Sequence, residues 1–426
     1  MKKKLNAILA VSGLAIVALA GCRRQIVVQG ISDDRVVVGN TAATSGNFAG
    51  VGTPFNFGLT ATLDAYNAIE TNVRKVDFKT YDDGFDQTTG INYTKRLVEE
   101  DKVFALVGHF GTPTVGGTIK YIKDKGVPMV YAATGINDLY QATSELSPVM
   151  PVQPIYRTDG RIMVARIFNS ELFGADGRNL PAASSLKVGI LATTTEEGVG
   201  QKVGVDEELV ARGVPAANIT TRSIPGGETP DAVAITAAVQ VIKASNVDVI
   251  ILAMNQTPYV ACLTALTAAG NTSPVFSGYV NSNAATVISA AANPNNPSFN
   301  FRLFGNAWLD ATSEAGWADY LDFYATVSAK DGGDAYAANA YAMAGFVAAK
   351  IFLQGLDRIK NVATDDVTFK GFIEAMESAP ISVPMGDSID FADGQRIGID
   401  SMCLLEWNAA GSAFALSQGF SSLSNL

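Results

Sequence analysis

The sequence has very little histidine and cysteine. Its 426 residues include one His, at position 109, and three Cys. A single histidine excludes zinc sites built on several histidines, and no CxxC pair is present to replace them. A Ser-His-Asp triad would have to use His109, but the chain lacks the Gly-x-Ser-x-Gly motif that presents a serine nucleophile. We therefore expect His109 to be structural or adjacent to a ligand, and we expect no catalytic residue and no metal site.

Cofactor motifs are also missing. Gly198-Val-Gly200-Gln-Lys-Val-Gly204 follows an apolar run, but its spacing is one residue longer than the dinucleotide fingerprint requires. No Gly-x-x-x-x-Gly-Lys-Ser/Thr loop is present to hold phosphates. These absences predict that the protein uses no cofactor and is not an enzyme.

Positive charge is scarce. The chain has 31 Lys and Arg against 41 Asp and Glu, a formal net charge of −10. An acidic protein of this kind is a poor partner for nucleic acid, whose phosphates need a positive surface. Hydrophobic residues make up 48% of the chain, and its length suits about two domains with large cores. Cys262 and Cys403 are either a disulfide pair or two buried thiols, and the sequence favours neither reading.

The N-terminus has the pattern of an export signal. Lys2 to Lys4 precede an apolar run from Leu5 to Ala20, which ends in Leu19-Ala20-Gly21-Cys22. A basic start, a short apolar core and small residues before a cleavage point are typical of a secretory signal peptide. The last four residues resemble a bacterial lipobox, which implies that residues 1–21 are removed and Cys22 is lipidated. The alternative is an ordinary signal peptide with an accidental cysteine. We expect residues 22–32 to be a tether that holds the protein to a membrane surface through its lipid.

The rest of the chain alternates apolar strands with helices, and does so in two series. Continuous apolar strands separated by helices predict parallel sheets covered on both faces, and hence an α/β fold with two lobes of similar design. The expected strands are Arg35–Gly39, Val76–Tyr81, Val103–Gly108, Pro128–Tyr131, Lys187–Ala192, Ile219–Ile224, Val247–Ala253, Pro274–Tyr279 and Phe301–Gly305. The expected helices are Pro54–Ile69, Thr88–Glu100, Val115–Lys125, a segment reaching Arg212, Asp231–Ala244 and Tyr259–Ala269.

The C-terminal part is less regular. An Ala-rich helix is predicted for Tyr336–Leu356, and the spacing of Tyr336, Tyr341 and Phe346 favours packing in the core over a face that contacts ligand. Asp390–Gln395 predicts a hairpin turn, because Asp-Gly suits a primed turn. A strand at Ser401–Trp407 and a second turn at Asn408–Ser412 follow. Residues 176–185 and 293–300 are rich in proline and polar residues, which predicts surface loops.

Hydroxyl-rich loops follow the first, third and fourth strands, at 41–46, 111–116 and 132–136. In an open α/β sheet the ligand lies beyond the carboxyl ends of the strands. Helices that begin there offer backbone N–H groups, and Ser45, Thr112, Thr114 and Thr134 add hydroxyls. The combination suits an anion such as a carboxylate, although each of these residues alone is also an ordinary helix cap.

The chain resembles the type I periplasmic binding proteins of branched-chain amino-acid ABC transporters. The resemblance is carried, in this order, by Val38–Gly46, Tyr81-Asp82-Asp83 with Asp86, Leu106–Phe110, Lys125–Val130 and Asp393-Gly394. It implies two Rossmann-like lobes joined by three hinge crossings, with the ligand between them. Lobe one would comprise 33–157 and 309–383, and lobe two would comprise 158–308 and 384–426. The positions that form a disulfide in that family hold Phe85 and Gly111 here.

The resemblance also implies a set of ligand contacts. The carboxylate-binding residues of the family correspond to Thr112, Ala133 and Thr134 in lobe one. Its ligand contacts in lobe two fall near Glu197, Asn255 or Gln256, and Tyr279. Amino-acid binders have an acidic residue where Tyr279 stands, and a phenol does not replace that ion pair. Glu197 either supplies the charge instead or is a solvated residue at a helix start.

The implied function is capture of a small polar solute outside the cytoplasm by closure of the lobes. The solute would be an amino acid or a related carboxylate or amide. The implied partners are an ABC permease and its cytoplasmic ATPase. A ligand-sensing lipoprotein or a cell-wall regulator on the same fold is the alternative.

Overall fold

The computed structural model describes residues 28–168, 180–226, 229–289, 298–311, 318–410 and 412–426. The predicted signal peptide, Cys22 and the first part of the tether lie outside these ranges, as do parts of the two predicted polar loops. Within the ranges, no helix combines the length and the apolar composition needed to cross a membrane.

Lobe one is built on a parallel sheet with the strand order β2-β1-β3-β5-β7. Helices α1 and α11 cover one face of the sheet, and α2 and α3 cover the other. A short parallel pair, β4 and β6, continues beyond the carboxyl edge. The strands are β1 (Arg35–Ala42), β2 (Lys75–Asp82), β3 (Ala105–Leu106), β4 (His109–Phe110), β5 (Met129–Val130), β6 (Ala132–Ala133) and β7 (Val149–Met150); the helices are α1 (Ala49–Ala68), α2 (Gln87–Glu99), α3 (Thr112–Lys125), α10 (Ala318–Ser328), α11 (Ala340–Arg358) and α12 (Phe369–Glu377).

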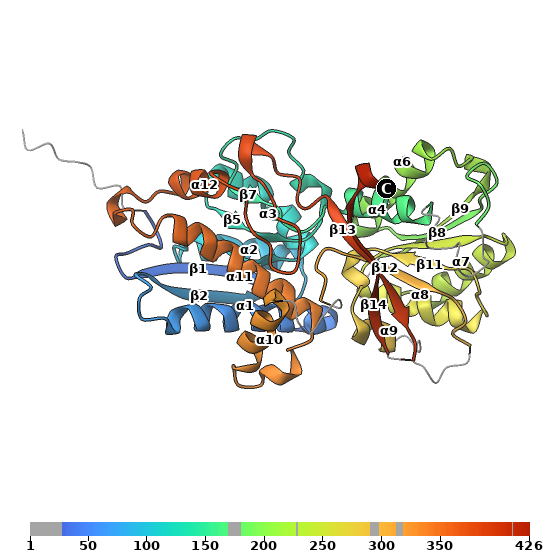
Figure 1. Ribbon diagram of the computed structural model, residues 1–426, viewed down its shortest axis with the longest axis horizontal. Coiled ribbons are helices and arrows are strands. Elements are labelled where there is room, and N and C mark those ends of the chain that lie inside the picture. The colour runs from blue at the N-terminus through green and yellow to red at the C-terminus, as the bar shows by residue number, and fades with distance from the viewer. Residues whose placement is uncertain (1–27, 169–179, 227–228, 290–297, 312–317, 411) are drawn as a thin grey trace, which may run out of the picture.

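Lobe two is built on a seven-stranded sheet with the order β14-β13-β12-β11-β10-β8-β9, parallel except for the last two strands of the chain, β13 and β14. Figure 1 shows the two lobes side by side along the long axis of the molecule. The strands are β8 (Val188–Thr193), β9 (Ile219–Ile224), β10 (Val249–Ala253), β11 (Val275–Ser277), β12 (Leu303–Ala307), β13 (Ser401–Asn408) and β14 (Ala413–Ser422); the helices are α4 (Tyr156–Ile167), α6 (Glu196–Ala211), α7 (Ala232–Ala244), α8 (Gln256–Ala268) and α9 (Ala284–Ser289).

Short 3-10 helices connect several of these elements. They are η1 (Gly46–Phe48), η2 (Asn137–Leu139), η3 (Ala216–Asn218), η4 (Tyr279–Asn281), η5 (Gly333–Ala335), η6 (Thr364–Asp366), η7 (Ala392–Gly394) and η8 (Leu423–Asn425).

Strand β10 shows why the predicted strands are apolar without interruption. Ile250 and Leu252 point into the core beneath α7 and α8, while Val249, Ile251 and Ala253 point into the core beneath α4 and α6. Because successive side chains of a strand alternate between faces, a sheet covered on both faces needs apolar residues at every position. Parallel strands that are buried on both faces, in two lobes, confirm the predicted α/β fold.

The chain passes between the lobes three times: between β7 and α4, between β12 and α10, and just before β13. The predicted three crossings are therefore present. Phe391 and Ile399 pack in the core cluster of lobe one, which favours a third crossing near residue 400. The residue limits of the lobes remain a proposal.

The glycines that imitate a dinucleotide motif serve helix packing. A Cβ atom at Gly204 of α6 would lie 1.9 Å from the carbonyl oxygen of Arg157 in α4, and one at Gly160 of α4 would lie 2.0 Å from that of Gln201 in α6. No side chain fits at such distances. The two helices therefore cross with their backbones in contact, and the glycine spacing reflects this crossing.

Three details of the C-terminal and central predictions are wrong or incomplete. Asp390–Gln395 does not form a hairpin turn. Its 3-10 turn is followed by Arg396, whose backbone exchanges hydrogen bonds of 2.9 and 2.8 Å with Gln141 of lobe one. The long helix begins at Ala340 rather than Tyr336, because the Asn339 side chain accepts hydrogen bonds from the N–H groups of Tyr341 and Ala342. The expected strand Val103–Gly108 is reduced to β3, and the separate strand β4 begins only after Gly108, which takes φ 59°.

The two described cysteines do not pair. Cys262 and Cys403 are both buried free thiols. Burial raises the pKa of each thiol to about 12, so neither ionises near neutral pH.

Candidate ligand-binding site

A cavity of about 560 Å³ lies between the two lobes. Lobe one contributes residues from η1, α1, α3 and α11, and lobe two contributes residues from α6, α8, η4 and the β13–β14 hairpin. Its volume falls within the range of roughly 300–1,000 Å³ that is typical of sites for whole small molecules. Because both lobes form its wall, a change in their separation changes its shape.

All the predicted ligand residues except Ser45 and Thr114 line this cavity. They are Thr112, Ala133, Thr134, Glu197, Asn255, Gln256 and Tyr279. Ser45 lies elsewhere: it is exposed, and its backbone N–H donates to the carboxylate of Asp82 at 3.2 Å. Thr114 is buried outside the cavity, where its hydroxyl donates to Asp83 at 2.7 Å. The structure therefore gives no support to a ligand contact by Ser45 or Thr114.

Three hydroxyl groups meet on one wall of the cavity. The Thr112 Oγ1 lies 2.8 Å from the Thr134 Oγ1 and 3.0 Å from the hydroxyl of Tyr156, and the last two oxygens are 3.3 Å apart. Thr112 begins α3 after Gly111, whose φ of 101° redirects the chain there. Burial, together with the negative charge of Glu197, raises the pKa of Tyr156 to about 12. All three groups are therefore neutral hydroxyls that can donate or accept.

Tyr279 lies beside this cluster and is held from lobe one. Its hydroxyl donates to the Pro154 carbonyl oxygen at 3.0 Å and lies 2.9 Å from the Gln153 side-chain amide. With its amide oxygen facing the loop, Gln153 accepts from the N–H groups of Thr134 (3.2 Å) and Gly135 (3.3 Å). These N–H groups were expected to be open to a ligand anion. The Thr134 N–H also donates to the Ala132 carbonyl oxygen at 2.9 Å, so these groups have partners within the protein instead.

Glu197 is the buried charged group of the cavity wall. It is the second residue of α6, it is 4% exposed, and its carboxylate accepts a hydrogen bond from the side-chain amide of Asn255. Burial raises the pKa of this carboxyl, against the lowering effect of hydrogen bonds from its own N–H, Thr195 and Asn255. The interpretation of Glu197 as a solvated helix-start residue is therefore wrong, because the side chain is shielded from water.

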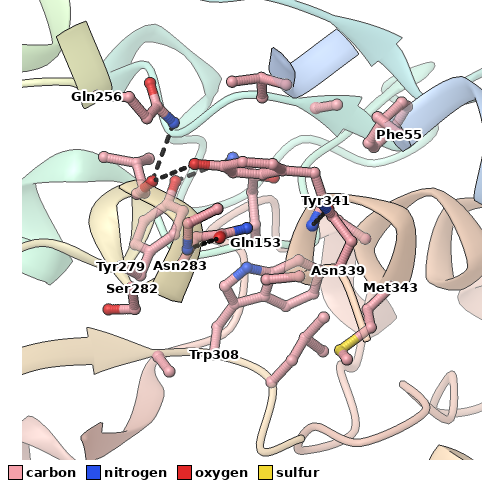
Figure 2. A pocket seen from close by; sticks show the side chains of 18 of the residues that line it. Phe55, Gln153, Gln256, Tyr279, Ser282, Asn283, Trp308, Asn339, Tyr341 and Met343 are labelled. Atoms are coloured by element: carbon pink, nitrogen blue, oxygen red, sulfur yellow. Dashed lines mark hydrogen bonds between the residues drawn. The ribbon is translucent and has the colours of Figure 1, made fainter. Parts of the chain in front are cut away.

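Aromatic rings form much of the remaining wall. Phe48 and Phe85 stack with centroids 3.9 Å apart, and Phe110 packs against Phe55 at 5.4 Å. Trp308, from the second crossing, adds a further apolar surface; Figure 2 shows its ring together with Met343 and Tyr341. The side chains are far apart in the sequence, and no local pattern marks them as one surface.

Tyr341 closes one side of the cavity. Its ring extends from the start of α11 toward η4 of lobe two (Figure 2), where its hydroxyl donates to the Val280 carbonyl oxygen at 3.4 Å. The Gln256 amide donates to the same oxygen at 2.9 Å. The sequence-based assignment of Tyr341 to the core is therefore wrong, although Phe346 on the same helix is fully buried as predicted.

The sequence matches the periplasmic binding protein family over residues 35–412. The chain belongs to this family. The resemblance drawn from the sequence is thereby confirmed, and the chain is a solute-binding protein rather than an enzyme. A comparison with curated proteins finds no match.

Solved structures similar to this periplasmic binding protein support the same fold. A fatty acid ABC transporter substrate-binding protein from Thermomonospora curvata aligns with a TM-score of 0.73 at 14% identity, covering 93% of this chain and 96% of that one. A branched-chain amino acid ABC transporter structure from Thermus thermophilus, with bound valine, aligns with a TM-score of 0.73 at 12% identity and coverages of 92% and 97%. A solute-binding protein from R. palustris in complex with benzoate aligns with a TM-score of 0.69 at 16% identity and coverages of 91% and 97%.

His109 has a structural position in this periplasmic binding protein. Its ring is fully buried, with Nδ1 accepting from the Thr41 N–H at 3.3 Å and Nε2 lying 3.0 Å from the Thr94 hydroxyl. Burial lowers the pKa of His109 to about 3, so the ring is neutral. It does not line the cavity. Of the two readings of His109, the structural one is supported.

Sequence reasoning missed the aromatic wall and several polar contributors to the site, among them Gln153, Tyr156, Trp308 and Tyr341. Tyr156 and Gln153 belong to the first crossing, a segment with no sequence pattern of its own. Trp308 belongs to the second crossing, and Tyr341 was assigned to the core. The family's lobe order would have pointed to the crossings, because the residues that connect two lobes necessarily lie at the base of the gap between them.

Proposed function

We propose that this periplasmic binding protein is the extracytoplasmic solute-binding lipoprotein of an ABC importer. It captures a small polar solute, an amino acid or a related compound, as the lobes close, and presents the closed form to a permease whose ATPase is in the cytoplasm. The observation that carries this proposal is the cavity itself, which takes its wall from both lobes and from the first two crossings.

Closure follows from the way the wall is divided. Lobe one supplies Thr112 and Thr134, and lobe two supplies Glu197, Asn255 and Gln256. A ligand that contacts both sets of residues makes all its contacts only when the lobes approach each other, so it binds the closed form more tightly than the open form. This difference in affinity shifts the equilibrium toward the closed form. The similar structures include one with bound valine, one in complex with benzoate and a fatty acid ABC transporter substrate-binding protein, which supports a small organic solute.

The test of capture is a distance measurement. Spin labels at Lys120→Cys on α3 and Val233→Cys on α7 sit on exposed positions of opposite lobes, in a Cys22→Ser background. Cys262 and Cys403 are buried and should not react. Native mass spectrometry of the purified protein identifies the co-purified solute, which is then removed and added back. We expect the distance distribution to change with the solute. A distribution that no metabolite changes would contradict capture by closure and would favour a regulator on the same fold.

The lipoprotein assignment is tested separately. Cells expressing the full chain are labelled with radioactive palmitate and fractionated. We expect the label and the membrane association to be lost together in Cys22→Ser. Label that persists in this variant would show that Cys22 is not the lipidated residue.

A further inference from the structure

The charge of the cavity is negative. Its wall includes the carboxylates of Glu197 and Asp334, and no Lys, Arg or His from the described part of the chain reaches it. A ligand anion inside the cavity would meet repulsion from Glu197 without a compensating cation. A ligand cation would find a partner.

Glu197 has no cationic partner among the described residues. The ion pairs of α6 involve Lys202, Asp206, Glu207 and Glu208 instead. The start of α6 stabilises the Glu197 carboxylate in part, yet burial still raises its pKa. The protein therefore compensates the negative charge of Glu197 only in part. A positively charged ligand in the cavity would compensate the rest.

The wall opposite Glu197 has few free groups that could bind an anion. Gln153 occupies the N–H groups of Thr134 and Gly135, and the hydroxyls of Thr112, Thr134 and Tyr156 already bond to one another. A carboxylate would have to break these contacts and would still lack a positive charge. Neutral donors of this kind suit an uncharged polar group or an aromatic edge equally well.

The rest of the wall is large and apolar. The rings of Phe48, Phe55, Phe85, Phe110 and Trp308 face a cavity of about 560 Å³. A ligand that fills such a space buries an apolar body against these rings, and this burial favours binding. The site therefore combines one buried carboxylate with an extended aromatic wall.

We infer that the solute is an amine with an aromatic or aliphatic body, whose protonated nitrogen pairs with Glu197 beside Asn255. This inference rests on the proposed function, because it names the class of solute that the same cavity captures. A carboxylate on the ligand is not required. Simple carboxylates and amides without a basic nitrogen are poor ligands.

Three probes of equal size test the charge preference: 3-phenylpropylamine, 3-phenylpropionate and 3-phenylpropionamide, measured by titration calorimetry on ligand-free protein. We expect the amine to bind at least tenfold more tightly than the carboxylate and the amide. In Glu197→Gln this preference falls by at least tenfold. Glu196→Gln removes the adjacent, exposed charge at the start of the same helix, outside the cavity wall, and keeps the preference within twofold.

Several results would overturn the inference. One is tighter binding of the carboxylate than of the amine, and another is no binding of any probe. A third is an equal effect of Glu196→Gln and Glu197→Gln, because this would indicate that the amine responds to the overall electrostatic potential rather than to contact with Glu197. Thermal melting shows whether Glu197→Gln is folded. If it is not, the identity of the co-purified solute decides: a solute with a basic nitrogen supports the inference. A solute without a basic nitrogen overturns the inference but leaves the proposed capture of a solute intact. Capture itself is contradicted only if the distance between the labelled lobes does not change with any solute.

Discussion

The hydroxyl oxygens of Thr112 and Tyr156 lie 3.0 Å apart across the first crossing between the lobes. Thr112 begins α3 of lobe one, and Tyr156 begins α4, which packs against α6 of lobe two. The contact therefore couples the ligand wall of lobe one to the first helix of lobe two. A ligand that engages this pair acts on the hinge itself.

Replacing Thr112 by Val removes one hydroxyl while keeping the shape of the side chain. We expect ligand affinity to fall by about 1–3 kcal/mol, because the site loses a donor and leaves the Thr134 and Tyr156 hydroxyls with one fewer partner. Titration calorimetry with the co-purified solute measures the change. Thr118→Val on the same helix is the control, since its hydroxyl donates to the Thr114 carbonyl oxygen away from the cavity. Equal affinity of Thr112→Val and the wild type would contradict the role of Thr112.

Tyr341→Phe removes the hydroxyl that reaches Val280 from the opposite lobe. We expect a shift toward the open form and an affinity lower by about 0.5–1 kcal/mol, the usual contribution of a neutral hydrogen bond. Distance measurements between labelled lobes and calorimetry report the two effects. Tyr336→Phe is the matched control, because Tyr336 lies outside the cavity wall. The prediction is contradicted if Tyr341→Phe closes as fully as Tyr336→Phe.

Asp159 makes stability depend on pH. It is fully buried on α4, where it accepts hydrogen bonds from Asn306 (2.8 Å), Gln201 (3.2 Å) and the Tyr279 N–H (3.3 Å). Burial outweighs these bonds and raises the pKa of Asp159 to about 7 from 3.8. The folded state therefore holds this proton more strongly than the unfolded state does.

It follows that stability from this group is complete below pH 4 and is lost as the pH rises toward and through 7. At about 1.4 kcal/mol per pKa unit the loss is at most about 4 kcal/mol. Asp159→Asn cannot ionise, so we expect its free energy of unfolding to fall less than that of the wild type between pH 5 and pH 8. Denaturant melts at several pH values test this. Parallel pH profiles for the two proteins would rule out Asp159 as the source.

Gly204→Ala tests the contact between α4 and α6. A Cβ atom there meets the Arg157 carbonyl oxygen at 1.9 Å, so the helices must separate. We expect a loss of about 1–3 kcal/mol in unfolding free energy, the usual result of overpacking. Gly50→Ala in α1 meets nothing within 4 Å and should be neutral or stabilising by up to about 1 kcal/mol. A Gly204→Ala variant that melts with the wild type would contradict the close crossing.

The cavity wall was predictable where it follows strands. Ala133 ends a short strand of lobe one, Thr112 and Thr134 closely follow such strands, and parallel strands end at one edge of their sheet. The side chains of Gln153, Tyr156 and Trp308 were not predictable in this way. They belong to crossings whose direction depends on how two finished lobes lie against each other, and no local periodicity records that direction.

The C-terminal segment shows the same division. Asp393-Gly394 has the local chemistry of a hairpin turn, yet the chain around it pairs with residues 141–144 of lobe one. Arg396, fully buried, then hydrogen-bonds to the Ser147 carbonyl oxygen and forms an ion pair with Glu377. Non-local partners that satisfy a buried guanidinium outweigh a two-residue turn preference.

The amino-acid sequence by itself determined the alternation of strands and helices, their division into two series and the polar loops at strand ends. Each of these is set by hydrophobic periodicity and by backbone preferences of neighbouring residues. Only the tertiary structure decided that Gln153 closes the expected anion site, that Ser45 lies outside the cavity and that Glu197 is buried beside an aromatic wall. These facts depend on side chains brought together from both lobes, where desolvation and partner geometry act on residues that are distant in the chain.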